Sequence, residues 1–120
     1  MIDIAALGLS LCLAAGNIDC DKVSFEYDKQ LKSDEVNGVT LLYTKSQHQV
    51  IKVSSEFKNN ERITTNILIH ELAHALVQQQ GHSINHNFKH LKVYRETCKE
   101  LMESLEHTDY KTCKKTVNYN

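Results

Sequence analysis

The chain has 120 residues, and its formal net charge is −1. This length supports one hydrophobic core, so we expect a single domain. The near balance of charge excludes the overall basic excess that is typical of nucleic-acid-binding proteins. The chain contains seven histidines, which is a high count, and it has no proline.

The first element is an apolar run over residues 4–15. It is too short to cross a membrane, and Asp3 stands where a secretory signal carries positive charge. We therefore expect a retained first helix in an intracellular protein, cytoplasmic or nuclear, with no membrane partner. A signal peptide over residues 1–16, and hence a secreted protein, is the alternative. The buried side of the helix would carry Ile4, Leu7, Leu11 and Leu13.

Three short segments then alternate apolar and polar residues with the period of a half-buried strand. They are Val23–Tyr27, Gly38–Tyr43 and Gln49–Ser54. Residues 45–48 fit a hairpin turn between the last two, and the polar stretch 28–37 is expected to be a loop. We expect the three strands to form a small antiparallel sheet.

Helical spacing begins near Glu61 or Thr64, and Thr64 and Thr65 can cap the helix. Gly81 is a natural helix terminator, and Ser83 can cap a second long helix. The apolar side of that helix comprises Ile84, Phe88, Leu91, Tyr94, Cys98, Leu101, Met102 and Leu105. The order of elements predicts an α+β domain over residues 1–106, followed by a polar tail over residues 107–120.

The first of these long helices contains His70-Glu71-Leu72-Ala73-His74, an H-E-x-x-H arrangement. Residues four apart on a helix point the same way, so both imidazoles can reach one ion. Zinc suits two neutral imidazoles, and a catalytic zinc needs a third protein ligand and one position for water. Glu71 lies about 100° further round the helix than His70, where it can act as general base for that water.

The third ligand is not unique in the sequence, because His82, His86 and His90 recur every four residues. His82 is favoured because it follows the glycine that ends the first site helix, and a sharp reversal there can return its ring to His70 and His74. His86 is the main alternative. His90 or a carboxylate is a third option, although Glu96 and Glu100 fall on the polar side of the last helix.

The four cysteines form no C-x-x-C pair, so a four-thiolate zinc ribbon is not encoded. We expect free, mostly buried thiols in a reducing compartment. The alternatives are a disulfide between Cys98 and Cys113 or one between Cys12 and Cys20.

Over residues 5–105 the chain resembles the SprT-like metallopeptidases, the zincin domain shared with the Spartan protease. The similarity is carried by V-S-F-E-Y, N-G-V-T-L-L-Y, V-I-K-V-S, N-N-E-R, N-I-L-I-H-E-L-A-H-A-L, G-H and F-K-H-L, in that order. The resemblance implies a minimal zincin fold, with an N-terminal helix, a three-stranded sheet, an active-site helix and a long C-terminal helix.

The resemblance also implies a zinc ion held by His70, His74 and the histidine of the G-H element, which is His82, with Glu71 as catalytic acid and base. The family has an aromatic residue four positions after that histidine, where this chain has His86, so His86 stays open as a ligand. An association with DNA is implied by the family alone, since no C-terminal zinc ribbon follows.

These observations predict a monomeric zinc metallopeptidase that hydrolyses peptide bonds in protein or peptide substrates. An extended substrate could pair with the sheet edge beside the active-site helix, for which Val50–Ser54 is the candidate. One alternative is a regulatory protease of the ImmA/IrrE type that cleaves a repressor. Another is a non-catalytic, metal-stabilised module that binds DNA or protein, with a small basic contact from Lys111, Lys114 and Lys115.

Overall fold

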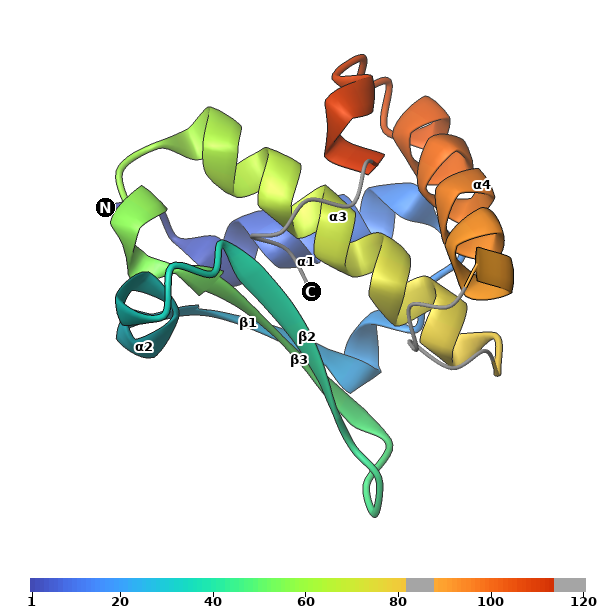
Figure 1. Cartoon of the computed structure of the whole chain (residues 1–120), viewed down its shortest axis with the longest axis horizontal. Helices are drawn as coiled ribbons and strands as arrows, with labels where there is room; N and C mark the ends of the chain where they lie inside the picture. Colours follow the sequence, from blue (N-terminus) through green and yellow to red (C-terminus); the bar gives the residue numbers. More distant parts are fainter. Residues whose placement is uncertain (82–87, 114–120) are drawn as a thin grey trace.

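The computed structural model of the chain describes residues 1–81 and 88–113. Its main helices are α1 (Ile4–Ala15), α3 (Glu61–Gln79) and α4 (Phe88–Ser104), and its strands are β1 (Val23–Asp28), β2 (Gly38–Tyr43) and β3 (His48–Ser54). The shorter elements are α2 (Lys29–Ser33), η1 (Cys20–Lys22), η2 (Ser55–Phe57) and η3 (Tyr110–Cys113). The expected α+β architecture is confirmed (Figure 1).

The sheet has the order β1-β3-β2, with β3 parallel to β1 and antiparallel to β2. The expectation of an antiparallel sheet is therefore wrong for one of the two pairings. Val50–Ser54 is also not an edge, because β3 lies between the other two strands. Alternation along a segment predicts that it is a strand, but it carries no information on which strand lies beside it.

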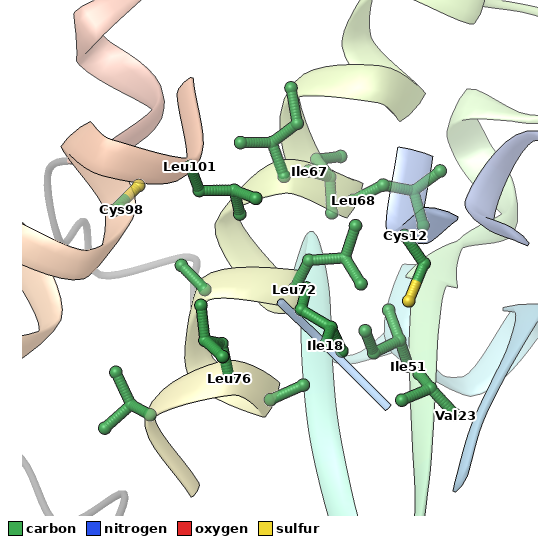
Figure 2. Close-up of a cluster of buried hydrophobic side chains, with 14 of the residues drawn as sticks. Cys12, Ile18, Val23, Ile51, Ile67, Leu68, Leu72, Leu76, Cys98 and Leu101 are labelled. Atoms are coloured by element: carbon green, nitrogen blue, oxygen red, sulfur yellow. The ribbon is translucent and has the colours of Figure 1, made fainter. Parts of the chain in front are cut away.

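One face of the sheet carries the core. Val23, Phe25, Ile51 and Val53 are buried on this face, and α1 and α3 pack against it. Helix α4 packs on α3 (Figure 1). Figure 2 shows leucine and isoleucine side chains of α3 meeting residues of the sheet on one side and of α4 on the other.

Helix α1 begins after Asp3, whose Oδ1 accepts a hydrogen bond from the Ala6 N–H at 3.1 Å. Its buried residues are Ile4, Gly8 and Cys12, at a spacing of four. Leu13 was expected on the buried side, but 63% of its surface is exposed. An apolar run around a whole helix does not show which side faces the core, and here the glycine at position 8 marks the side that approaches Phe25.

Helix α3 is buried all round from Ile67 to Val77. It begins after Asn60, whose Oδ1 accepts from the Ile63 N–H at 3.0 Å, so the cap expected at Thr64 or Thr65 is wrong. Thr64 is instead inside the helix, and its hydroxyl bonds to the Phe57 carbonyl at 2.9 Å.

The expected end of α3 and part of the expected buried side of α4 are confirmed. The φ of Gly81 is +87°, the left-handed value of a helix terminator, as expected. In α4, Tyr94, Cys98, Leu101 and Met102 are buried, which confirms that part of the predicted apolar side. Ser83 and Ile84 lie outside the described residues. No helix in the described part of the chain is long and apolar enough to cross a membrane.

All four cysteines are in disulfides, Cys12–Cys20 and Cys98–Cys113. The expectation of free thiols is wrong, and both alternative pairings are present. In each pair one cysteine lies on a long helix and the other in a short 3₁₀ turn that packs back on it. The spacing of the cysteines suggests these two pairs. The sulfur atoms come within bonding distance only because each 3₁₀ turn folds back onto its helix.

The segment after α4 differs from the polar tail expected from residue 107. Thr112 and Cys113 are buried, and η3 packs against α3 and α4. The segment up to residue 113 is therefore part of the folded unit.

The stretch expected to be a loop contains α2, which begins after Asp28. The Oδ1 of Asp28 accepts from the backbone N–H groups of Gln30 and Leu31, at 2.6 and 3.3 Å. Its Oδ2 lies 3.2 Å from Lys52 Nζ on β3. Burial opposes ionisation of this carboxyl, but Lys52 and the two N–H groups outweigh it and lower the pKa of Asp28.

We expect Asp28→Asn to lower the free energy of unfolding at pH 7 by about 0.5–1 kcal/mol, because the amide keeps the cap and loses the charge. The folded pKa lies below the unfolded value of about 3.9, so the carboxylate stabilises the fold above about pH 4. This contribution is lost as the pH falls through the folded pKa. Urea unfolding between pH 7 and pH 2 measures it.

Glu26→Gln is the matched control, because Glu26 also lies near Lys52, at 3.8 Å, but caps no helix. It should change the stability less than Asp28→Asn. A stability loss for Asp28→Asn that stays constant down to pH 2 would contradict the assignment.

Candidate active site

The two histidines of the motif lie side by side on successive turns of α3. The centroids of the His70 and His74 rings are 5.1 Å apart, and the ring planes make an angle of 68°. Both are buried, with 1% and 3% of their surface exposed. The helix has thus brought the two imidazoles together inside the protein.

The orientation of His70 is set by η3. Its Nδ1 lies 2.7 Å from the Thr112 carbonyl oxygen. A carbonyl only accepts, so this hydrogen bond requires a proton on Nδ1. In the neutral ring the lone pair is then on Nε2.

His74 is oriented by a ring of α4. Tyr94 stacks on it, with centroids 4.1 Å apart and an interplanar angle of 21°. The Tyr94 hydroxyl donates to the His70 carbonyl at 3.0 Å. The sequence showed Tyr94 only as one more apolar position of α4, and its contact with the motif depends on how the two helices pack.

Glu71 points toward the sheet and is fully buried. The Thr40 hydroxyl of β2 lies 2.8 Å from Glu71 Oε1 and 3.1 Å from the Glu71 carbonyl oxygen, and it can donate to either. Within residues 1–81 and 88–113, Oε2 has no hydrogen-bond partner. Burial raises the pKa of Glu71 well above its usual range, and the Thr40 hydrogen bond opposes this only in part.

Gly38, the first residue of β2, leaves room for this carboxyl. A Cβ at this position would lie 2.6 Å from Ile67 Cγ2 and 3.2 Å from Glu71 Oε2. The motif is therefore divided between two sides of α3. The imidazoles face α4 and η3, and the carboxyl faces edge strand β2.

The residues present fit two ligands of a zinc ion. Two imidazoles on one tetrahedral zinc have ring centroids about 5 Å apart, given Zn–N distances of about 2.1 Å, and the observed separation is 5.1 Å. A histidine ligand also commonly donates its other ring N–H to a backbone carbonyl, as His70 does.

The third ligand is not settled by the described part of the chain. His82 and His86 lie outside the described residues, as does the side chain of His90. Glu96 and Glu100 are exposed on α4. Within residues 1–81 and 88–113, no group of three histidine, cysteine or acidic side chains is close enough to hold a metal.

A pocket of about 350 Å³ lies near the end of α3, apart from the motif. Its lining includes Leu42, Gln49, Gln78 and Gly81. Gln49 Nε2 donates to the Ala75 carbonyl at 3.0 Å and to Gln78 Oε1 at 2.8 Å. These amides satisfy one another and the backbone, so we assign this pocket no catalytic role.

Comparison with known proteins identifies no relative. No family model matches the chain, and neither a curated protein nor a solved structure matches it. The similarity to the SprT-like pattern therefore stays a prediction, and the function has to be inferred from the chain's own side chains.

We expect Thr40→Val to lower the free energy of unfolding of the metal-free protein by about 1–3 kcal/mol at pH 7. The substitution keeps the shape of the side chain but removes the hydroxyl that bonds to the buried Glu71 carboxyl. Thr40→Ser is the control, because it keeps the hydroxyl. Equal urea midpoints for the two variants would show that the hydrogen bond does not hold the carboxyl.

Proposed function

We propose that the chain is a zinc-dependent metallopeptidase of the SprT-like type that hydrolyses peptide bonds in protein or peptide substrates. His70 and His74 are two of the metal ligands, and Glu71 carries the proton. The observation that supports this most directly is the pair of adjacent buried imidazoles, one with its Nδ1 bonded to the Thr112 carbonyl.

A purely structural pair of buried histidines accounts for less of this arrangement. Two adjacent rings in the core would destabilise each other on protonation, because neither charge could be solvated. A third titratable group, Glu71, is buried one residue away from His70. Burying three titratable groups in one stretch of helix lowers the stability of the fold. A metal site would explain why they are nevertheless there.

We assign the third ligand to His82, with His86 as the alternative. His82 follows directly after Gly81, whose left-handed φ ends the helix that carries the other two ligands. A histidine at this turn would give a site with three imidazoles, which is one of the ligand sets of catalytic zinc.

A zinc ion held there would polarise the scissile carbonyl and lower the pKa of a coordinated water. Glu71 takes a proton from the attacking water as the C–O bond forms, and then passes it to the leaving amine as the C–N bond breaks. Thr40 keeps the Glu71 side chain at the β2 edge, and Tyr94 and Thr112 keep the two imidazoles oriented.

The strand with which an extended substrate would pair is β2. It pairs only with β3 among the described strands, so its other edge carries backbone groups that a peptide can pair with. It is also the strand that contacts Glu71 through Thr40. A peptide added here would lie beside the catalytic carboxyl, whereas the central position of β3 excludes the same role for Val50–Ser54.

The disulfides bear on where the protein works. Cys12–Cys20 and Cys98–Cys113 are typical of an oxidising compartment rather than a reducing cytoplasm. They favour an extracytoplasmic peptidase over the intracellular expectation, and this is the location that we propose. Because Cys12 lies on α1, this location requires residues 1–16 to be retained and not removed as a signal peptide.

We expect Glu71→Gln to keep zinc and lower the rate of peptide cleavage by roughly 10²–10⁴-fold, because the amide cannot accept the proton. The measurement is cleavage of an unstructured protein such as casein, together with the metal content of the same sample. Glu61→Gln, at the exposed start of α3, is the control and should cleave normally. Cleavage that survives Glu71→Gln would refute the mechanism.

We expect one zinc per chain in the wild type. His70→Ala, His74→Ala and His82→Ala should each lose it, because a three-histidine site does not retain zinc tightly with two ligands. Atomic emission on dialysed samples measures the content. His48→Ala is the control, because His48 lies on β3, where its ring Nε2 bonds to the Ser24 hydroxyl.

His86→Ala should keep the zinc. Loss of zinc in His86→Ala and its retention in His82→Ala would move the third ligand to His86. A wild type without zinc would overturn the proposed function.

A further inference from the structure

The segment after α4 is attached to the helices that carry the site by a disulfide and by a side-chain hydrogen bond, among other contacts. The Cys98–Cys113 disulfide joins the end of η3 to α4 across 15 residues of sequence. Asn66 Nδ2 on α3 donates to Asp109 Oδ2, just before η3, at 3.1 Å. The segment is thus held to α4 by a covalent bond and to α3 by a side-chain hydrogen bond.

The residue next to the cross-linked cysteine is the one that contacts the site. Thr112 precedes Cys113, and its carbonyl oxygen lies 2.7 Å from Nδ1 of His70. The Thr112 N–H donates to the Asp109 carbonyl at 3.0 Å. The backbone of this turn is therefore fixed on both sides of the carbonyl that His70 uses.

We propose that Thr112 is a positioning residue for His70 and that the Cys98–Cys113 disulfide holds it in place, so that the affinity of the site for zinc depends on this cross-link. The proposal rests on the proposed function. It adds that a redox-sensitive bond outside the motif controls how His70 is presented to the metal.

Without the Cys98–Cys113 disulfide, η3 is held in place only by non-covalent contacts. The turn η3 has four residues, and without the cross-link the few hydrogen bonds of its backbone compete with water. Once the Thr112 carbonyl moves away, the His70 ring loses the bond that selects its tautomer and its orientation. Loss of such a partner typically costs about 10–100-fold in metal affinity.

The chain contains its own control. The Cys12–Cys20 disulfide joins α1 to η1 across 8 residues. Among the described residues, the groups that orient His70, Glu71 and His74 come from η3, β2 and α4, and not from α1 or η1. Figure 2 shows Cys12 and Cys98 on opposite sides of the α3 core residues. Removal of either disulfide costs stability, but only one of them holds a group that contacts a ligand.

The test compares Cys98→Ser/Cys113→Ser with Cys12→Ser/Cys20→Ser by competition for zinc with a chromogenic chelator. We expect the first double variant to raise the Kd for zinc about 10–100-fold over the wild type, and the second to change it by less than about 3-fold. Equal changes in the two variants would overturn the proposal.

Asn66→Ala provides a second route that leaves both disulfides intact. It removes the hydrogen bond to Asp109 and loosens the same turn, so the Kd for zinc should rise by a few-fold. This variant keeps the proposal testable if the first double variant does not fold. An unchanged Kd in Asn66→Ala would count against the proposal.

The ring tautomer can be read without metal. In ¹⁵N-edited NMR of the metal-free wild type, His70 should carry its proton on Nδ1, and Cys98→Ser/Cys113→Ser should lose this preference while Cys12→Ser/Cys20→Ser keeps it. A wild type that binds no zinc but shows the Nδ1 tautomer would refute the proposed function and the dependence of zinc affinity on the cross-link, and would leave only the orientation of His70 by Thr112. Zinc binding and cleavage with a tautomer that does not depend on the disulfide would refute the positioning role alone.

Discussion

The complete burial of α3 is the constraint on which the rest of the structure depends. Every side chain from Ile67 to Val77 is buried, so the ionisable groups of the motif have little access to water and need partners in the protein. The partners come from η3, α4 and β2, in the form of Thr112, Tyr94 and Thr40. A turn, a helix and a strand are thus positioned around one central helix.

This arrangement separates the groups by their chemistry. The imidazoles face two elements that approach from the C-terminal part of the chain, and Glu71 faces an edge strand, where Gly38 leaves space for the carboxyl. In the proposed reaction the imidazoles stay fixed as metal ligands, and the Glu71 carboxyl has to come within hydrogen-bond reach of the attacking water at the same site. Each of the two disulfides also restricts the unfolded chain, which stabilises the folded state.

Much of the fold could be predicted from the sequence. The strands and long helices are close to where periodicity places them, because the burial of one side imposes a period of two or of 3.6 on the residues. Prediction failed where that period was absent or ambiguous. Leu13 belongs to a helix that is apolar all round, and its exposure follows from the approach of Gly8 to Phe25. The parallel pairing of β1 with β3 depends on the path that the chain takes between the strands, which periodicity does not reveal.

The sequence by itself determined the three strands, the three long helices and the adjacency of His70 and His74, because a spacing of four puts two side chains on one face of a helix. Only the tertiary structure decided which groups orient them. Thr112 lies 42 residues from His70 along the chain, and Thr40 lies 31 residues from Glu71. Contacts at such separations depend on how elements pack and on which cysteines meet, and neither leaves a periodic trace in the sequence.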